Sequence, residues 1–589
     1  MKRITGLFTL LTFMTLASCD SAKQTGENPF FSEWETPYGV PPFDKIRPEH
    51  FMPAFERGMS LHDAEIDAIT SNNDEPTFEN VILAYDNSGQ MLAQTSLIFG
   101  MLCAAENTPQ MQALQEEVMP LLTAHADKIR LNEQLFDKVK AVYDNRATLG
   151  LDAEQLRLTE KTYDGFVRAG ALLDADGKAR LKQINEELAL TAVKFGNNLL
   201  AENNNYALVL DGDQLDGLPA GVRDLAREKA ESMGKSGKYV FTLHKQQYAL
   251  DEEMLRPYFS LQNVQNGIFF LANRLYGITF RPVAVPLYHP EAVAYEVLDV
   301  DESHLGVIYF DFFPRDGKSQ GAWCGNYVEQ TYHDGKRVAP VVSIVCNFTR
   351  PTRSDPALLT LDETETLFHD VKYRGLTEVE GDFVELPSQI MENWAFEPEM
   401  LRQYAVHYRS DEVIPQYLID KLRRSELFNQ GFMTTELIAA ALSDMDIHSM
   451  TEYAPFDPMA FEREALTEKR GLIPQIEPRY RYPYFSHIFD GGYSAGYYFY
   501  TWAEVLDKDA FEAFRESGDL FNRRIADDFR HKLLARGGSE DGMTLYRAFR
   551  GKDPDKRAML KGRGLWNEPD PEPADETEPR PGDDMQAAR

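Results

Sequence analysis

At 589 residues, the chain is long enough to bury a large core and to form several subdomains. Hydrophobic residues make up 43% of it and aromatic residues 12%, which argues against disorder over most of its length. The formal net charge of −33 argues against nucleic-acid binding, because such a surface repels phosphate backbones.

The N-terminus has the features of an export signal. Lys2 and Arg3 give it a positive start, and the apolar stretch Leu7–Leu16 that follows is too short to span a bilayer. No second hydrophobic segment of the sequence is long enough to cross a membrane. We therefore expect an exported protein.

Residues 16–19 read Leu-Ala-Ser-Cys, which resembles a bacterial lipobox, in which the cysteine becomes the lipidated first residue. The alternative is a cysteine that ends an ordinary signal peptide by chance. The lipobox interpretation predicts a signal peptide over 1–18, a lipid on Cys19 and a polar tether over 19–28. The protein would then contact the membrane only through this anchor, on the periplasmic side or at the cell surface.

Apolar residues recur at three- and four-residue spacing from Pro48 to about Asn205, which predicts a stack of long antiparallel helices. Strand-like segments lie at 206–210, 239–243, 295–300, 307–313 and 341–348. The pattern is helical again from Leu361 to about Leu560. The sequence thus predicts a mainly α fold with a small β-sheet.

Residues 566–589 differ in composition from the rest of the chain. They contain five prolines and eight acidic residues. Because the segment has too few apolar side chains to pack, we predict a disordered tail.

Three further cysteines, Cys103, Cys324 and Cys346, stand singly in the sequence. No C-x-x-C pair exists, which argues against a cysteine-based metal site. Their odd number also argues against a full disulfide framework.

One segment combines charge with an apolar helical pattern. Residues 360–369 begin one helix, and Asp382–Trp394 forms another soon after. Glu385 and Glu392 are seven residues apart, which places both carboxylates on one helical face. Unpaired carboxylates are costly to bury, so the pattern predicts a functional site. The alternative is two surface carboxylates near a turn.

Residues 382–394, which read DFVELPSQIMENW, resemble the third-ligand helix of the peptidyl-dipeptidase, oligopeptidase A and thimet oligopeptidase family. The resemblance covers nearly the whole chain and is closest to bacterial peptidyl-dipeptidases. Further matching segments follow in the same order at 28–34, 41–45, 320–323, 486–500, 536–541 and 561–565. The resemblance implies a two-lobed, multi-helical peptidase fold with a deep channel. It divides the chain into an N-terminal helical region over 29–247 and a catalytic domain over 248–565.

Members of this family are zinc peptidases. A helix with His-Glu-x-x-His supplies two imidazole ligands and a general base, and a downstream Glu is the third ligand. The resemblance implies that His369 is the first imidazole ligand and Glu385 the downstream ligand. Zinc is therefore the expected cofactor, and short peptides are the expected partners of a monomeric protein.

The resemblance also implies residues that hold the substrate. His487, Tyr493 and Tyr500 match those that grip the peptide and stabilise the tetrahedral oxyanion. Further substrate contacts are implied for Ala322, Trp323, Tyr497, Gly491 and Gly492. Glycines in this segment would keep the loop mobile enough to close on a peptide. The alternative for the tyrosines is packing in an aromatic core.

The sequence departs from the family directly after His369. Asp370-Val-Lys-Tyr373 stands where the family has its Glu and its second His. An internal deletion of about three helical turns is one interpretation. A degenerate motif, with Asp370 for Glu and Tyr373 for His, is the other. Both lack a two-His site, and Glu365, His369 and Glu385 remain the only candidate ligand set.

A second gap separates Lys245 from Tyr248. Only Gln246 and Gln247 stand where the family has a long helical stretch. Its absence would expose apolar surface or open the wall of the channel.

Three hypotheses follow from these residues. The first is a zinc peptidase that releases C-terminal dipeptides from short peptides. The second is a peptide-binding lipoprotein that keeps His487, Tyr493 and Tyr500 but has lost catalysis. The third is a deletion product without function.

Overall fold

The computed structural model describes residues 28–241 except 217 and 219, 254–369 except 334 and 335, and 379–566. Several features predicted from the sequence lie outside these residues: the signal peptide, Cys19, nearly all of the tether and of the acidic tail, the Gln246-Gln247 gap with the 247/248 domain boundary, and the residues that follow His369.

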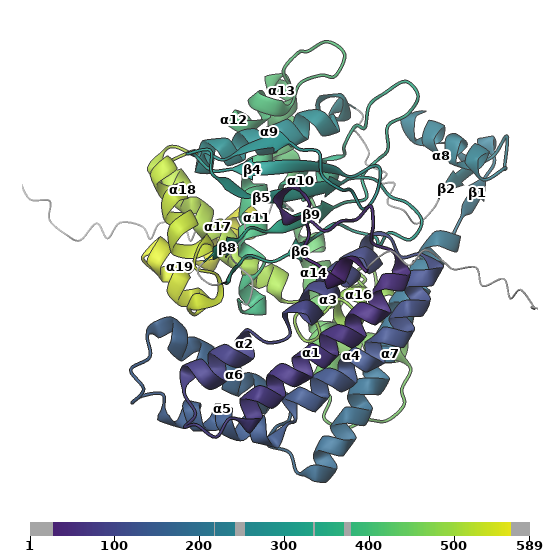
Figure 1. The fold of residues 1–589 in the computed structure, drawn as a ribbon. Helices are drawn as coiled ribbons and strands as arrows, with labels where there is room; N and C mark the ends of the chain where they lie inside the picture. Colours follow the sequence, from purple (N-terminus) through teal and green to yellow (C-terminus); the bar gives the residue numbers. More distant parts are fainter. Residues whose placement is uncertain are drawn as a thin grey trace, which may run out of the picture.

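Long helices fill the N-terminal region, as the apolar spacing predicts. They are α1 (Phe51–Ser71), α2 (Ala84–Asp86), α3 (Gln90–Ala105), α4 (Pro109–Arg130), α5 (Glu133–Asn145), α6 (Ala153–Arg168) and α7 (Ala175–Asn205). Helix α4 begins where Thr108 accepts a hydrogen bond from the backbone N–H of Met111 and Pro109 occupies the first turn. Figure 1 shows these helices in the lower part of the molecule, where α1 packs against α3 and α4 against α7.

A five-stranded sheet occupies the centre of the upper part (Figure 1). Its strands are, in spatial order, β3 (Thr279–Pro282), β4 (Val293–Leu298), β5 (His304–Asp311), β9 (Val341–Val345) and β6 (Trp323–Val328). β5 and β9 run parallel, and the other neighbours are antiparallel. The segments predicted as strands at 295–300, 307–313 and 341–348 correspond to β4, β5 and β9.

The two faces of the sheet are both covered, which explains the continuous apolar run of β5. Val307 and Tyr309 point to one face and join a core with residues of α1 and α3. Ile308 and Phe310 point to the other face and join the main core, which includes residues of α9 (Leu261–Tyr276), α11 (Leu386–Ala395) and α17 (Phe499–Ser517). The sheet therefore links the N-terminal helices to the C-terminal ones.

The C-terminal half is helical, as predicted for 361–560. Besides α11 and α17 it contains α10 (Leu361–His369), α12 (Pro398–Tyr404), α13 (Gln416–Ser425), α14 (Gln430–His448), α15 (Pro458–Arg463), α16 (Ser486–Phe489), α18 (Arg523–Phe529), α19 (Gly542–Arg550) and α20 (Lys556–Gly562). The fold is mainly α with a small sheet, which confirms the predicted class. None of the helices described has the length and apolar character needed to cross a membrane.

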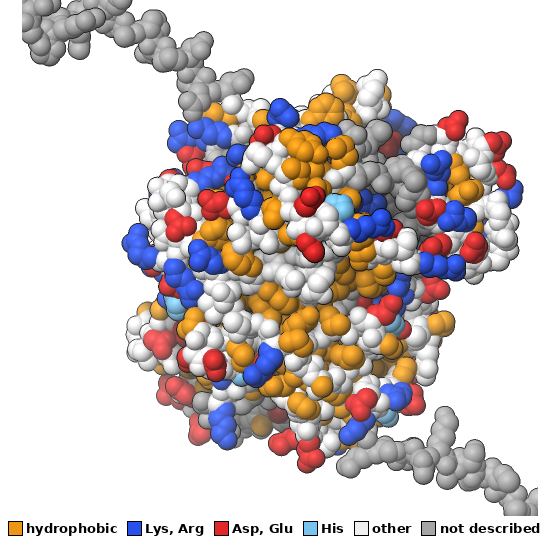
Figure 2. Space-filling model, turned by 90° about the horizontal axis from the view of Figure 1, so that it is seen from above, with side chains coloured by type: hydrophobic (Ala, Val, Ile, Leu, Met, Phe, Trp, Pro, Cys, Tyr) orange, Lys and Arg blue, Asp and Glu red, His pale blue; other side chains and the backbone are white. Residues whose placement is uncertain are grey.

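A small unit projects from the body at the upper right of Figure 1. Strands β1 (Leu208–Leu210) and β2 (Tyr239–Phe241) pair with each other and pack against α8 (Ala220–Ser232). β7 (Thr331–His333) and β8 (Lys336–Val338) form a separate antiparallel pair. On the face drawn in Figure 2, acidic and basic side chains are interspersed, so this face shows no large patch of one charge.

The predicted helix over 382–394 is shorter than expected. Residues Gly381–Phe383 form a single 3-10 turn, and α11 begins only at Leu386, with Glu385 at its N-cap position. Pro387 lacks a backbone N–H, so it is tolerated in the first turn of a helix and not further inside. The proline therefore sets where the helix starts.

Candidate active site

A cavity of about 3310 Å³ forms a channel in the molecule. The N-terminal helices α3, α4 and α7 contribute to its lining, and so do β6, α10, α11, α14 and α17. Because both halves of the chain contribute, the channel matches the deep groove that the resemblance implied.

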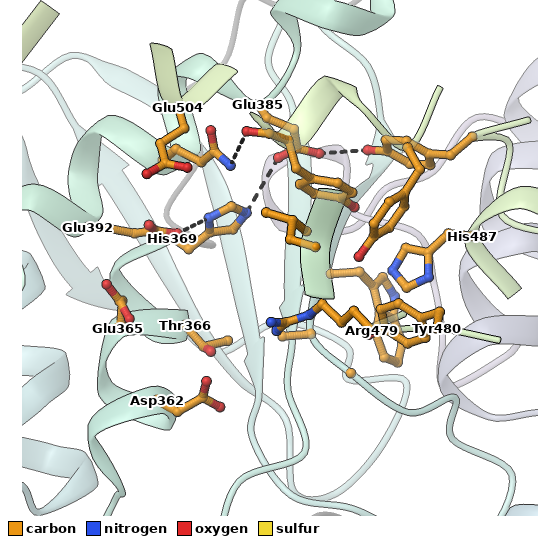
Figure 3. A pocket seen from close by; sticks show the side chains of 18 of the residues that line it. Asp362, Glu365, Thr366, His369, Glu385, Glu392, Arg479, Tyr480, His487 and Glu504 are labelled. Atoms are coloured by element: carbon orange, nitrogen blue, oxygen red, sulfur yellow. Dashed lines mark hydrogen bonds and ion pairs between the residues drawn. The ribbon is translucent and has the colours of Figure 1, made fainter. Parts of the chain in front are cut away.

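His369, the last residue of α10, lies between two carboxylates (Figure 3). Its Nδ1 is 2.5 Å from Oε1 of Glu392, and its Nε2 is 3.4 Å from Oε2 of Glu385. Both carboxylates come from the segment of α11, which packs against α10. The seven-residue spacing thus placed them on one face, as predicted. The spacing in the sequence indicated Glu392 together with Glu385, whereas the family resemblance assigned a role only to Glu385.

Glu385 is almost fully buried, with 4% of its surface exposed. Its Oε1 accepts a hydrogen bond of 2.6 Å from the Tyr493 hydroxyl, and its Oε2 accepts one of 2.9 Å from the Ser388 hydroxyl. Burial and the charge of Glu385 raise the pKa of Tyr493, so this hydroxyl stays protonated and donates. Glu385 therefore connects the imidazole of His369 to residues 491–500, called here the tyrosine segment because it contains Tyr493, Tyr497 and Tyr500.

His487 lies among aromatic rings. Its ring centroid is 4.7 Å from that of Tyr480 and 5.4 Å from that of Tyr497, while Tyr493 and Tyr500 stack on each other 5.4 Å apart. Burial, helped by the positive charge of Arg479, lowers the pKa of His487 to about 4. The imidazole is therefore neutral near pH 7. Its Nδ1 is buried and has no hydrogen-bond partner among the described residues.

Asp444 of α14 holds the tyrosine segment in place. This fully buried carboxylate accepts hydrogen bonds of 2.9 Å from the backbone N–H groups of Ala495 and Tyr497. His448, one turn further along α14, bonds to the same carboxylate at 2.7 Å. Ala495 adopts a left-handed backbone (φ 54°), which these two bonds help to offset.

The glycines of this segment have a steric role. A Cβ on Gly491 would lie 2.9 Å from the Cα of His487, and one on Gly496 would lie 2.7 Å from the ring of Phe499. Gly492 has φ +84° and is not among the residues that line the channel, whereas Gly491 is. Hydrogen bonds within the segment and to Asp444 hold its backbone in this conformation, and glycine at 491 and 496 permits close approach. The mobility expected from the sequence stays a prediction.

Ala322, Trp323 and Cys324 line the channel from the start of β6. Asn347 Nδ2 donates hydrogen bonds of 2.8 Å to the carbonyls of Ser319 and Gly321, which fixes the turn before this strand. The sequence pattern did not reveal β6 as a strand, because Gly and Asn interrupt it. The implied contacts at 322 and 323 are nevertheless found in the same cavity as His369, Glu385, Tyr497 and the three residues His487, Tyr493 and Tyr500.

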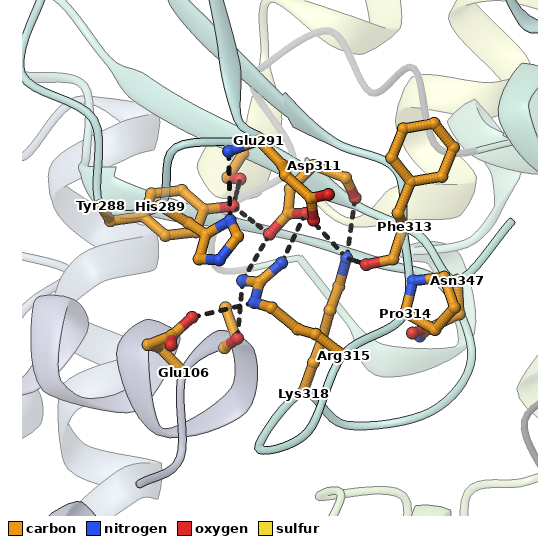
Figure 4. A network of polar contacts seen from close by, with 12 residues as sticks. Glu106, Tyr288, His289, Glu291, Asp311, Phe313, Pro314, Arg315, Lys318 and Asn347 are labelled. Carbon is orange, nitrogen blue, oxygen red and sulfur yellow. Dashed lines mark hydrogen bonds and ion pairs between the residues drawn. The ribbon is translucent and has the colours of Figure 1, made fainter. Parts of the chain in front are cut away.

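A buried ionic network supports the same turn (Figure 4). Asp311, at the end of β5, accepts two hydrogen bonds of 2.8 Å from Arg315 and one of 2.9 Å from Lys318 Nζ. Lys318 is fully buried and also donates to the carbonyl of Phe313 at 2.9 Å. Arg315 bonds in addition to Glu106 at 2.9 Å, which ties the turn to the end of α3.

Glu365 lies one helical turn before His369. Its side chain is open to the channel, yet the surrounding protein deprives it of bulk water. This loss of hydration, followed by the charge of Glu392, raises the pKa of Glu365 to about 8. The raised pKa means that this carboxyl group keeps its proton to a higher pH than an ordinary Glu does.

The residues that the structure describes do not complete a zinc site. His369 Nε2 and Glu385 Oε2 are donors of the right kind and face each other. In the part of the chain that the structure describes, however, no group of three or more His, Cys, Asp or Glu side chains is arranged to hold a metal ion. A catalytic zinc takes three protein ligands, so these two donors alone do not fit it. The predicted set of Glu365, His369 and Glu385 is not formed.

Comparison with known proteins gives a consistent result. Residues 238–565 match peptidase family M3. A "dipeptidyl carboxypeptidase" of Escherichia coli (strain K12) is 34% identical, and the alignment covers 92% of this chain and 100% of the relative. An "oligopeptidase A" of the same organism is 27% identical, and the alignment covers 90% of this chain and 99% of the relative. A solved structure described as "PZ peptidase A with inhibitor 2" is 12% identical with a TM-score of 0.42, covering 89% of this chain and 98% of its own. The first alignment spans 681 positions, more than this chain has, so that relative contains residues without a counterpart here.

Proposed function

The chain belongs to peptidase family M3, and from that premise we propose that its channel binds short peptides as a peptidyl-dipeptidase does, while hydrolysis is impaired. One observation carries the proposal: His487, Tyr493 and Tyr500 meet Glu385 and His369 in a single large channel. Relatives described as dipeptidyl carboxypeptidase and oligopeptidase A support a peptide as the ligand.

The side chains of the channel suit a peptide backbone. Neutral His487 lines the channel, so its imidazole can accept from a peptide N–H or donate to a carbonyl, depending on its tautomer. The stacked rings of Tyr493 and Tyr500 offer hydroxyl groups beside it. Residues at the start of β6 provide further backbone groups along the wall. Together these groups bind and orient a peptide without any bound metal.

Hydrolysis in this family requires zinc and a general base. This chain lacks the Glu and the second His that follow the first His in the family. His369 and Glu385 are the two residues that could hold the metal, and the described residues add no third ligand. Glu365 lies on α10 one turn before His369, whereas the general base of the family directly follows the first His. We therefore assign no hydrolytic step to this site.

A residual zinc peptidase is the second candidate. The observation that favours it is the imidazole of His369 facing the carboxylate of Glu385 at 3.4 Å, because these are two of the three ligands of a family site. This candidate predicts stoichiometric zinc and activity that a chelator abolishes.

One experiment separates the two candidates. Purified protein is analysed for zinc, its affinity for a blocked tetrapeptide with a free C-terminus is measured by calorimetry with and without chelator, and released dipeptide is followed by mass spectrometry. We expect binding that is indifferent to chelator, with no dipeptide released. The double variant Tyr493→Phe/Tyr500→Phe should bind at least several-fold more weakly, whereas Tyr453→Phe, at a site 85% exposed, should bind as the original chain does.

Two other outcomes would contradict the proposal. Chelator-sensitive release of dipeptide from protein with one zinc per chain would establish the peptidase. A folded sample that binds no peptide would contradict the proposed function.

A further inference from the structure

Asp490 directly follows α16 and lines the channel beside α7. Its backbone N–H donates to the carbonyl of Ser486 at 2.9 Å, which closes the single turn of α16. A Cβ on Gly196 of α7 would overlap with Oδ2 of Asp490, so glycine at this position makes room for the carboxylate. Phe489, the preceding residue, packs against Phe195 of α7 with 5.3 Å between the ring centroids. The carboxylate of Asp490 therefore lies at the junction of α7 and α16.

The carboxylate of Asp490 has no cationic partner among the described residues. Its side chain is open to the channel, yet the surrounding protein removes part of its water and raises the pKa of Asp490 to about 6. Two basic side chains of the lining, by contrast, are held by carboxylates: Arg515 by Glu397 at 2.8 Å and Lys552 by Asp509 at 3.0 Å. Asp490 is thus available to pair with a cation that a ligand brings.

The part of α7 that leads to Gly196 presents small side chains to the channel. Ala189, Ala192 and Val193 line it. They lie seven, four and three residues before Gly196, so all four positions share one face of the helix. Lys and Arg side chains lay their aliphatic stems along apolar surface and keep the charged head at a polar group. A face of small apolar residues that ends at a carboxylate fits such a side chain.

The charge of the whole lining favours the same kind of ligand. Sixteen acidic and eight basic side chains line the channel. A cavity with an excess of acidic groups attracts cations and repels anions over distances longer than one contact. A peptide that carries Lys or Arg is therefore favoured over one that carries Asp or Glu.

We propose that Asp490 binds the cationic side chain of a Lys or Arg residue of the peptide, so that the channel selects basic peptides. The proposal rests on the proposed peptide-binding function and adds the class of side chain that is recognised. His487 precedes Asp490 by three residues and lines the same channel, so one peptide can contact both.

The test uses a series of acetylated tetrapeptides with a free C-terminus. The parent peptide has norleucine at all four positions, and in the others one Lys replaces norleucine at each position in turn. The affinity of the purified protein for each peptide is measured by calorimetry. We expect Lys at one position to raise the affinity about tenfold, within the range of a hydrogen bond to a charged group, and Glu at that position to lower it.

Variants assign the preference to a residue. Asp490→Asn should abolish the preference for Lys and leave the affinity for the norleucine peptide unchanged. Gly196→Ala should reduce the same preference, because the new Cβ would displace the carboxylate. Asp490→Lys should reverse it, so that the Glu peptide binds more tightly than the Lys peptide. Glu512→Gln is the matched control: it removes one carboxylate of the lining that lies 3.8 Å from Arg515, and it should retain the preference.

Equal affinity of the original chain for the norleucine peptide and every Lys peptide would overturn the proposal and leave peptide binding intact. An equal loss of preference in Asp490→Asn and Glu512→Gln would also overturn it, because the preference would then belong to the charge of the lining as a whole. Binding of no peptide would overturn the proposed function itself. Should Asp490→Asn not fold, Gly196→Ala decides the matter, and a preference that this variant retains in full would count against Asp490.

Discussion

Asp444 does not line the channel, yet it holds several parts of the site in place. It is fully buried, and it accepts the backbone N–H groups of Ala495 and Tyr497 on one side and the ring of His448 on the other. The bond to Asp444 raises the pKa of His448 above its usual value. A protonated His448 therefore balances a buried charge that would otherwise be compensated only by two amide dipoles.

This pair makes the stability of the site depend on pH. A raised pKa in the folded state means that the stabilisation is fully present below the unfolded pKa of about 6.5 and is lost as pH rises through the folded value. We expect His448→Ala to destabilise the protein by about 1 to 2 kcal/mol at pH 6 and by much less at pH 9, as measured by thermal unfolding at both pH values. His531→Ala, an exposed ring bonded to a backbone carbonyl, is the control. An equal loss at both pH values would contradict the pairing.

Part of the site could be predicted from residue spacing, and part could not. The seven-residue separation of Glu385 and Glu392 was enough to place both on one side of a helix, and both contact His369. The role of Asp444 could not be foreseen, because its partners lie about fifty residues away in sequence and are backbone groups of any residue type.

Among the secondary-structure elements, β6 is a strand that the sequence pattern did not predict. Its residues are half-buried on average, and its Gly and Asn interrupt the apolar pattern by which β4 and β5 were recognised. β6 is also an edge strand, paired only with β9, so it needs less apolar surface than a central strand. What fixes it is the turn before it, through Asn347 and the Asp311–Arg315–Lys318 network.

We expect Lys318→Met to test this support. Removing one partner from a fully buried ionic network leaves the remaining charges less well compensated, which costs about 3 kcal/mol. The thermal midpoint should fall, and peptide affinity should fall with it because residues 319–323 line the channel. Lys140→Met removes an exposed lysine paired with Asp144 and should change neither quantity. A variant at position 318 that unfolds at the original temperature would show that the network does not support the turn.

At the scale of the whole molecule, periodicity predicted the class correctly. Helices over 51–205, a small sheet and helices over 361–562 all follow from apolar spacing, because long amphipathic segments have few alternative structures. The channel could not be derived in this way. It arises between elements far apart in the sequence, and only the resemblance to a peptidase family implied it before the structure placed α7 and α17 on its walls.

The whole molecule is expected to be attached to a membrane. Because residues 16–19 resemble a lipobox, we propose that attachment to the membrane depends on Cys19. The full chain, expressed in a bacterium that processes lipoproteins, should sediment with the membrane fraction, and Cys19→Ser should release it into the soluble fraction. Cys324→Ser is the matched control and should stay with the membranes. A Cys19→Ser variant that still sediments would contradict the anchor.

Cys324 makes the interior of the channel chemically addressable. Cys103 and Cys346 are buried, whereas Cys324, which forms no disulfide with a described cysteine, is half-buried, lines the channel and helps to raise the pKa of Tyr493. A small alkylating reagent must enter the channel to reach this sulfur, and a bulky one meets the walls first. The rate at which the thiol is alkylated therefore measures how much of the channel is occupied by a ligand. This measurement does not depend on whether any peptide bond is hydrolysed.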